Sequence, residues 1–204
     1  MKKMLAGSMA LCTMGSALAA QCDFTPSPDQ FAYGFTGYGF PDKSYVVENN
    51  TFSDFELASE SGKLLGATIN IKTASVDTSA DPGNWDKSGE WPEATILVRN
   101  QNIATGLFGN FVDGESIKAE IAEIDGEKVV LAVTMNGVTQ NIDMPYTVAD
   151  GVFNAKGTLD LVDFDTAEAM EKFAAICSAA WHQGKTWTDV DIYFSVPVAE
   201  SACE

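Results

Sequence analysis

The side chains that could do acid–base, nucleophilic or metal chemistry are scattered through this sequence, and His182 is its only histidine. The nearest sulfur nucleophile, Cys177, is five residues away, which gives no support for a Cys-His or Ser-His-Asp arrangement. A metal site with one histidine would need carboxylates alone to complete it, and the HxH, HExxH and CxxC spacings are absent. His182 is therefore interpreted as a helix-capping residue or as a contact to the head group of a ligand.

The densest group of carboxylates lies in DLVDFDTAE, which contains Asp160, Asp163, Asp165 and Glu168. A calcium loop needs acidic residues at alternate positions, a glycine turn and a distal glutamate, and this order is not met. The pattern favours a solvated turn followed by a helix N-cap. The glycines of GFTGYG and GKT lack the strand, spacing and helix that a phosphate loop requires. No residue is predicted to be catalytic or to bind a metal, and we expect the protein not to be an enzyme.

The elements that position these side chains are mostly strands. From Phe31 onward, apolar and polar residues alternate with a period of two, which predicts half-buried strands. The dipeptides at 125–126, 136–137 and 150–151 are Asp-Gly, Asn-Gly and Asp-Gly, which predict tight hairpin turns. The stretch FAYGFTGYGFPDK is predicted to be the first strand, with its aromatic side chains turned inward and its glycines allowing it to bend.

One helix is predicted late in the chain. DTAEAMEKFAAICSAAWHQGK predicts a helix over Thr166–Gln183, with Asp165 or Thr166 as its N-cap. WTDVDIYFSVPV then alternates again and closes the fold as a strand. ATILVRN is also predicted to be a strand, with Ile96 and Val98 facing inward.

Eight or nine antiparallel strands with one helix before the last strand predict an all-β, up-and-down barrel. A barrel of eight strands is about the smallest that can hold a ligand inside. The inward faces include the small residues Ala67, Ala119, Ala155 and Gly157. Small residues leave room for a ligand, but alternation of small and large residues also fills a tapering barrel, so a cavity and a packed core both remain open.

The N-terminus has the pattern of a secretory signal over residues 1–20. Two lysines precede a short apolar run, and ALA at 17–19 is a small-x-small cleavage site. The run is shorter than the ~20 apolar residues that a membrane span needs. We expect residues 21–204 to form one mature domain, periplasmic or secreted, without stable membrane insertion.

The formal net charge of -17 disfavours nucleic acid and anionic lipid surfaces as partners. It does not prevent an apolar ligand from binding inside the protein. Three cysteines follow the signal pattern, and two of them are expected to pair in an oxidising compartment. Cys22–Cys203 is the preferred disulfide because it joins the two ends of the mature chain, and Cys177 is then a buried free thiol.

Several stretches together resemble the YceI-like family. GATINIKTASVDTS resembles its strand and Ser-x-Asp-Thr element, EWPEATILV its next strand start, TMNGVTQNIDMPYTV its hairpin, AKGTLDLVDF its following strand, and GKTWTDVDIYFSV its closing strand. Order and spacing match over roughly 31–198. The resemblance implies a secreted, lipocalin-like antiparallel barrel that binds a long apolar chain, such as a quinone tail, an isoprenyl phosphate or a fatty-acid derivative.

Several departures from the family pattern affect the expected head group. The charged Arg-Asp-x-His element of the family is replaced by ADPGNWDK, Gln140 stands in place of a lysine, and Val162 in place of an arginine. Fewer basic groups near the mouth of the barrel disfavour a pyrophosphate. A neutral head, such as a quinone or an amide, is the expected fit.

These observations support three hypotheses. The first is a binding protein that transports, stores or sequesters an isoprenoid (quinone-like) or fatty-acyl lipid, with no other cofactor and either as a monomer or as a homodimer. The second is a lipid-modifying enzyme with Asp163, Asp165 or His182 at the mouth. The third is a secreted interaction or stress-response module with a filled barrel. The residues expected to line the cavity are Phe31, Tyr33, Phe35, Phe52, Phe55, Ile69, Ile71, Ile96, Val98, Leu131, Val133, Met135, Met144, Tyr146, Phe153, Leu159, Leu161 and Phe173.

Overall fold

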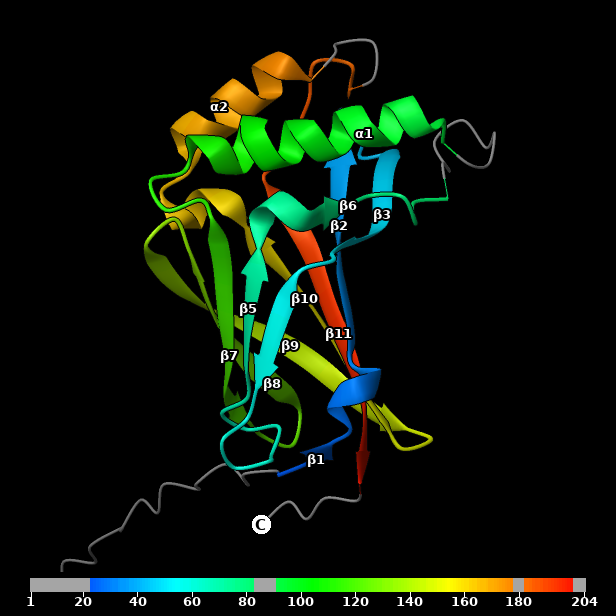
Figure 1. Cartoon of the computed structure of the whole chain (residues 1–204), viewed down its shortest axis with the longest axis vertical. Coiled ribbons are helices and arrows are strands. Elements are labelled where there is room, and N and C mark those ends of the chain that lie inside the picture. Colours follow the sequence, from blue (N-terminus) through cyan, green and yellow to red (C-terminus); the bar gives the residue numbers. More distant parts are fainter. Residues whose placement is uncertain (1–22, 83–90, 178–181, 200–204) are drawn as a thin grey trace, which may run out of the picture.

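The computed structural model describes residues 23–82, 91–177 and 182–199, and this part of the chain is mostly β. One curled antiparallel sheet forms the body, and two helices lie across one end of it (Figure 1). The strands are β1 (Thr25–Pro26), β2 (Ala32–Gly39), β3 (Tyr45–Phe52), β4 (Phe55–Ala58), β5 (Thr68–Lys72), β6 (Val76–Asp77), β7 (Ser116–Ile124), β8 (Lys128–Met135), β9 (Val138–Ala149), β10 (Val152–Asp160) and β11 (Asp189–Ala199). The helices are α1 (Glu93–Gln101) and α2 (Ala167–Ile176), with the shorter segments η1 (Pro28–Gln30), η2 (Thr73–Ser75), η3 (Asn102–Leu107), η4 (Phe108–Asn110) and η5 (Leu161–Phe164).

The sheet returns on itself through two bent strands. Its order is β4-β5-β7-β8-β9-β10-β11-β2-β3-β6, with β1 added beside β11. β3 leads directly into β4, and β5 leads through η2 into β6. Because β3 pairs with β6 and β4 pairs with β5, these two bent strands run side by side and bring the two ends of the strand order together. Backbone hydrogen bonds from Ser53 N to Ser75 O (3.0 Å) and from Lys72 N to Asp54 O (2.9 Å) cross the bend. Eight strands remain when each bent pair counts as one strand and β1 is left aside, which lies within the predicted eight or nine, although the segment ATILVRN is not among them.

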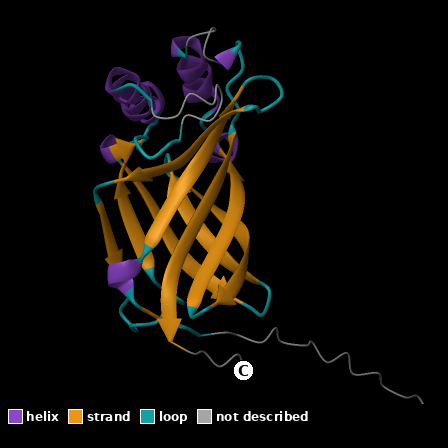
Figure 2. Ribbon diagram, turned by 90° about the vertical axis from the view of Figure 1, so that its right-hand side faces the viewer, coloured by secondary structure: helices purple, strands orange, loops and turns teal. Residues whose placement is uncertain are grey.

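The sheet is a half-barrel because backbone pairing is missing between the start of β2 and β4. β2 pairs with β3 only from Phe35 onward, whereas β4 pairs with β5. Side chains cover this seam: the Tyr33 ring lies edge-on to Phe55, with centroids 5.1 Å apart, and the Tyr33 hydroxyl donates to Phe52 O at 2.7 Å. Figure 2 shows the strands crossing along the body, with the two long helices at one end.

The three predicted hairpins are confirmed. Asn136 and Asp150 both adopt a φ of 53°, and each is followed by a glycine with positive φ, as the tight type I′ turn requires. The third turn is held differently, because the Asp125 carboxylate accepts hydrogen bonds from the backbone of Glu127 and Lys128, both at 2.7 Å. These turns fix the register of β7 to β10, and with it the inward faces of these strands.

The prediction of a strand at ATILVRN is wrong, since this segment is the helix α1. Pro92 precedes the first turn and Glu93 lies within it, which is a pattern typical of a helix start. Half-buried residues recur at Ile96 and Arg99 in α1 and at Ile103 in η3, which is helical spacing, whereas Val98 is 55% exposed. The run of β-branched residues suggested a strand, but packing of this face against the sheet favours the helix.

The late helix is confirmed as α2, which is shorter than predicted and ends at Ile176. Thr166 occupies the N-cap position, but its hydroxyl donates to Leu161 O at 2.6 Å instead of capping the helix. Asp165 is the left-handed residue (φ 56°) that ends η5. Residues 178–181, which belong to the predicted helix, lie outside the described residues, as do Cys22, Cys203 and the signal pattern at 1–20.

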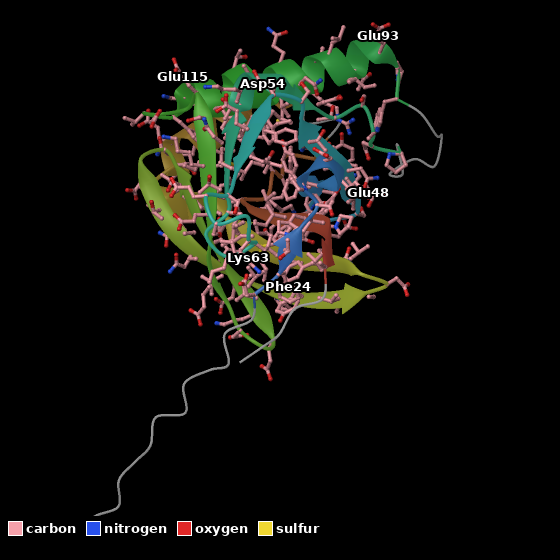
Figure 3. All side chains as sticks on the ribbon, turned by 60° about the horizontal axis from the view of Figure 1, so that its bottom comes forward. Phe24, Glu48, Asp54, Lys63, Glu93 and Glu115 are labelled. Carbon is pink, nitrogen blue, oxygen red and sulfur yellow. The ribbon has the colours of Figure 1, made fainter. Side chains whose placement is uncertain are left out.

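At the end of the barrel away from the helices, aromatic rings form a packed cluster, which is called the packed end below. Phe24 lies edge-on to Phe153 at 5.0 Å between ring centroids, and Phe153 stacks on Tyr146 at 4.5 Å and on Phe194 at 5.7 Å. A Cβ on Gly157 would come within 2.8 Å of the Met144 side chain, so no free space exists there. Figure 3 shows Phe24 at this end, and carboxylates such as those of Asp54, Glu93 and Glu115 on the outside.

Candidate functional site

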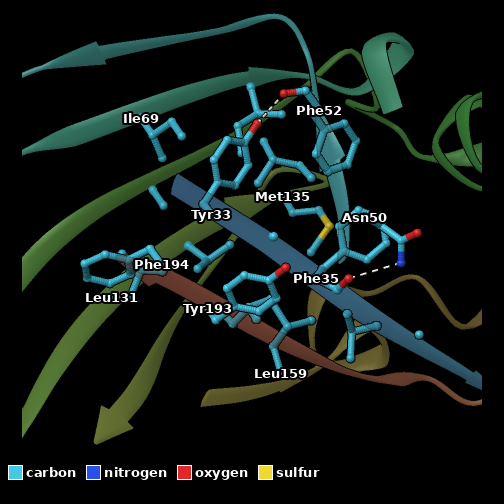
Figure 4. Close-up of a pocket in the computed structure, with 18 of the residues that line it drawn as sticks. Tyr33, Phe35, Asn50, Phe52, Ile69, Leu131, Met135, Leu159, Tyr193 and Phe194 are labelled. Carbon is cyan, nitrogen blue, oxygen red and sulfur yellow. Dashed lines mark hydrogen bonds between the residues drawn. The ribbon is translucent and has the colours of Figure 1, made fainter. Parts of the chain in front are cut away.

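A cavity of about 550 Å³ lies inside the barrel, and its lining extends from Pro26 and Leu64 to the helices. Its walls are the inward faces of the strands, and η3, η4 and α2 contribute Ile103, Leu107, Phe108, Met170 and Phe173. Most of the lining side chains are apolar, and the close-up in Figure 4 shows aromatic and aliphatic groups from several strands pointing into one space. The volume lies within the usual range for small-molecule sites.

Most of the residues predicted to line a cavity do so. Those on its surface are Phe31, Tyr33, Phe35, Phe52, Ile69, Ile71, Leu131, Val133, Met135, Met144, Leu159, Leu161 and Phe173. Phe31 precedes β2, Leu161 is in η5 and Phe173 is in α2. The others come from strands, where the period-two pattern brings them together because it places alternate residues on the inner face of the sheet.

Five predicted residues are not among the lining residues. Phe153 is fully buried in the packed end, and Tyr146 stacks against it. Phe55 packs at the seam against Tyr33, behind the cavity surface. Ile96 and Val98 belong to α1, where the helical period turns Val98 to solvent.

The aromatic side chains of the first strand face inward, as the sequence predicts. Phe31, Tyr33 and Phe35 line the cavity, and burial raises the pKa of Tyr33 to about 12, against the opposing effect of its hydrogen bond to Phe52 O. The pairing of β2 with β3 shifts register between Phe35 and Gly37. The Asn50 amide fills this irregularity, because its Nδ2 donates to Phe35 O (3.1 Å) and to Val47 O (2.7 Å).

The small inward residues divide into two groups. Ala67 and Ala119 lie on the cavity surface, so there the missing side-chain volume is open space. Ala155 and Gly157 lie outside this cavity lining: Ala155 is buried in a packed cluster, and a Cβ on Gly157 would meet the side chain of Met144 at 2.8 Å. The interior is therefore open beside Ala67 and Ala119 and filled beside Gly157.

Polar groups gather where the cavity meets α1 and the segment before β11. Tyr45, Arg99, Cys177, His182 and Thr186 all line this end. The rings of Tyr45 and His182 lie edge-on with centroids 5.0 Å apart, and the charge of Arg99 lowers the pKa of both groups. This group, called the polar end below, is the part of the site that the sequence pattern missed, apart from His182.

Arg99 is held at the polar end by a buried carboxylate. Its Nη2 lies 2.5 Å from Asp81 Oδ2, and the side chain of Asp81 is fully buried. The Trp91 indole donates to the same oxygen at 2.6 Å, and the Arg99 guanidinium lies over the Trp91 ring, 4.6 Å from its centroid. Arg99 Nη1 is buried and has no hydrogen-bond partner among the residues that the structure describes.

The other titratable groups of the polar end are neutral at pH 7. Burial lowers the pKa of His182, and the charge of Arg99 lowers it further, against a hydrogen bond to the backbone of Lys185. Burial raises the pKa of the Cys177 thiol, which is free, and raises that of Tyr45, where Arg99 opposes the shift. Among the described residues, no group of three or more histidine, cysteine or acidic side chains is placed to hold a metal ion.

Comparison with known proteins identifies the family of this fold. A family model described as the YceI-like domain matches residues 39–198. The chain belongs to the YceI-like family. The resemblance inferred from the strand motifs is thereby confirmed, although residues 31–38 of the expected span lie before the matched region.

Two solved structures are similar to this YceI-like chain. BcnA from Burkholderia cenocepacia is 12% identical, with a TM-score of 0.48, over 86% of this chain and 99% of that chain. A mutant of a protein titled CJ YceI is 17% identical, with a TM-score of 0.43, over 78% of this chain and 85% of that chain. No curated protein matches this sequence. In the part of the chain that the structure describes, no helix is both long and apolar enough to cross a bilayer.

Proposed function

We propose that this YceI-like protein is a non-catalytic binding protein that holds the apolar chain of an isoprenoid or fatty-acyl lipid in its barrel. The observation that carries the proposal is the internal cavity of about 550 Å³ with its predominantly apolar wall. Transfer of an apolar chain from water to such a wall is favourable by about 0.8 kcal/mol per CH₂ group. A chain of ten or more carbons would therefore bind without any charged contact.

The secretory pattern of residues 1–20 supports a periplasmic location for this binding. A lipid chain is insoluble in an aqueous compartment, and a barrel that encloses it would allow storage, sequestration or transport there. The charge of the protein is consistent with such a role, because the net charge of -17 keeps the outer surface hydrated while the apolar contact with the lipid is made inside.

Native mass spectrometry of the mature protein, purified from periplasm without detergent, tests this proposal. We expect a stoichiometric adduct that disappears after organic extraction, and lipid analysis of the extract then gives the chain and the head group. A clean apo mass, with no uptake of quinones or fatty amides on incubation, would contradict lipid binding and favour an interaction module instead.

A further inference from the structure

The cavity reaches the surface of the protein on one side of the barrel. Most of the described residues that line it are buried or half-buried, and the exposed ones lie on η1, on β4, or on the loop and strand start that follow β4. These exposed lining residues are Pro28, Leu57, Ala58, Gly62 and Thr68. Since η1 directly precedes β2, and β4 lies across the seam from the start of β2, they mark an opening beside the seam.

Leu57 shows that this opening leads into the interior. It pairs with Ile69 on β5, and two positions earlier Phe55 pairs with Ile71. Because directly paired residues of antiparallel strands point to the same face of a sheet, Leu57 faces the inside of the barrel together with Ile69. Leu57 is nevertheless 37% exposed, whereas Ile71 is 7% exposed. The wall of the barrel is therefore open to solvent beside Leu57.

The cavity lining is more enclosed elsewhere. At the helical end, Leu107, Phe108 and Met170 lie on the cavity surface and are at most 6% exposed. At the opposite end, the packed end encloses Phe153, which is fully buried. The lining residues of the polar end are buried or half-buried. The seam is thus the part of the wall where the lining is most open to solvent.

The two sides of the seam are joined by few main-chain contacts. β4 pairs with β5 and is the first strand of the sheet order, so its other edge has no partner strand among the described residues. Toward the helices, the Tyr33 hydroxyl donates to Phe52 O at 2.7 Å, which Figure 4 shows as a dashed line. Away from the helices, Leu64 N donates to Phe24 O at 2.8 Å. Segments held mainly by side-chain contacts separate more easily than strands held by a backbone ladder.

From this geometry we propose that the seam is the entrance of the cavity and that the Tyr33 hydroxyl is its latch. The lipid chain enters sideways between the start of β2 and β4 when the hydrogen bond from Tyr33 to Phe52 O opens. The inference rests on the proposed function and adds the route by which the ligand reaches its site. The five exposed lining residues are uncharged, so an apolar chain passes the opening without displacing a charged side chain.

Stopped-flow uptake of diphenylhexatriene by the delipidated mature protein tests the latch, because this neutral, rod-shaped hydrocarbon fluoresces only in apolar surroundings. Tyr33→Phe keeps the ring and removes the latch. Tyr146→Phe is the matched control, since its hydroxyl donates to Asp125 O at the same 2.7 Å. We expect Tyr33→Phe to raise the rates of uptake and release about threefold to tenfold, as loss of one hydrogen bond from the closed state implies, and Tyr146→Phe to change neither. Wild-type rates in Tyr33→Phe would overturn the latch.

A second pair of variants tests the position of the entrance. Leu57→Trp places a larger ring in the opening, whereas Lys185→Trp adds the same ring near the polar end, where Lys185 Nζ lies 4.4 Å from the Trp187 ring centroid. We expect Leu57→Trp to slow uptake about tenfold, because the ring must be displaced at each entry, and Lys185→Trp to leave uptake unchanged. Slow uptake in Lys185→Trp, with the wild-type rate in Leu57→Trp, would overturn the seam as the entrance.

The tyrosine pair keeps both aromatic rings, so it gives an answer even where Leu57→Trp fails to fold. Equal acceleration by Tyr33→Phe and Tyr146→Phe would also overturn the proposal, because it would reflect general loosening of the barrel. Failure of the wild-type protein to take up the probe at all would instead contradict the proposed function, on which the entrance depends.

Discussion

His182 is a neutral, mostly enclosed imidazole. Its ring faces Tyr45, and it packs so closely on Gly39 that a Cβ there would lie 2.8 Å from Nδ1. Burial and the charge of Arg99 both lower its pKa in the folded state. In the unfolded chain a histidine has a pKa of about 6.5, so the unfolded state takes up a proton at a higher pH than the folded state does.

This difference predicts that the free energy of unfolding falls as the pH is lowered through and below about 6.5, the unfolded value for histidine, since the unfolded state binds more protons in that window. His182→Phe keeps an aromatic ring in the same space and removes the titration. We expect its urea midpoint to change less than that of the wild type between pH 8 and pH 5.5. Parallel midpoint curves for the two proteins would contradict the assignment, and Lys118→Gln is the control that should follow the wild type.

The roles of some residues could be predicted from the sequence, whereas the role of Arg99 could not. The inward aromatic side chains of the first strand could be predicted because alternation alone places Phe31, Tyr33 and Phe35 on one face. Arg99 could not be found in this way. Its role depends on Asp81, which lies 18 positions earlier, and no local pattern links the two. Its position at helical spacing between Ile96 and Ile103 was the only available signal.

The β8–β9 hairpin does more than reverse the chain. The Nδ2 of Asn136 donates to Phe164 O at 2.8 Å and to Asp165 O at 3.2 Å, and its Oδ1 accepts from the backbone N–H of Val112 at 2.6 Å. One turn residue thereby joins the hairpin to η5 and to the loop after η4. Both segments border the helical end of the cavity, so this turn helps to hold that end in place.

We predict that Asn136→Gly destabilises the protein by about 1–3 kcal/mol, because glycine keeps the positive φ but removes the three hydrogen bonds. Asp150→Gly is the matched control, since Asp150 has the same φ of 53° in the β9–β10 turn. Urea denaturation of the two variants measures the difference. Equal losses for both would show that the side-chain bonds of Asn136 contribute nothing.

The wrong prediction at α1 arose because the local sequence carries two conflicting signals. Within ATILVRN, the β-branched residues favour a strand, whereas the preceding Pro92-Glu93 pair favours a helix start. A strand there would have extended the barrel. As a helix the segment crosses the end of the barrel instead, as Figure 1 shows, and it carries Arg99 to the cavity. The other strands and the late helix were predictable because their patterns carry one consistent signal.

The interior of the whole barrel is divided between a packed end and a cavity, and composition could not reveal this division. Ala119 on β7 and Ala155 on β10 are both inward alanines of one sheet, yet only Ala119 lines the cavity. Which of them leaves room depends on the side chains across the barrel. Those side chains come from strands far away in the sequence, so the sequence alone left both alternatives open.

A pair of cavity-filling substitutions tests this division. We predict that Ala119→Phe abolishes the lipid adduct and changes the free energy of unfolding by less than about 1 kcal/mol, since the added ring occupies existing space. Ala155→Phe adds the same ring where Tyr146 and Phe194 are the cross-strand neighbours, and should cost about 1–3 kcal/mol from overpacking. Urea denaturation and native mass spectrometry measure both effects. Equal destabilisation by the two variants would contradict the presence of a cavity at Ala119.

The sole arginine and the sole histidine of the sequence both line the polar end of the cavity. The protein therefore carries its own spectroscopic labels at this position. In a nitrogen-15 NMR spectrum, one set of imidazole signals and one guanidinium group report on the polar end without any assignment by mutagenesis. Occupation of the cavity, the protonation of His182 and the chemistry of the head group could then be followed in the unmodified protein, each through a resonance that has no counterpart elsewhere in the chain.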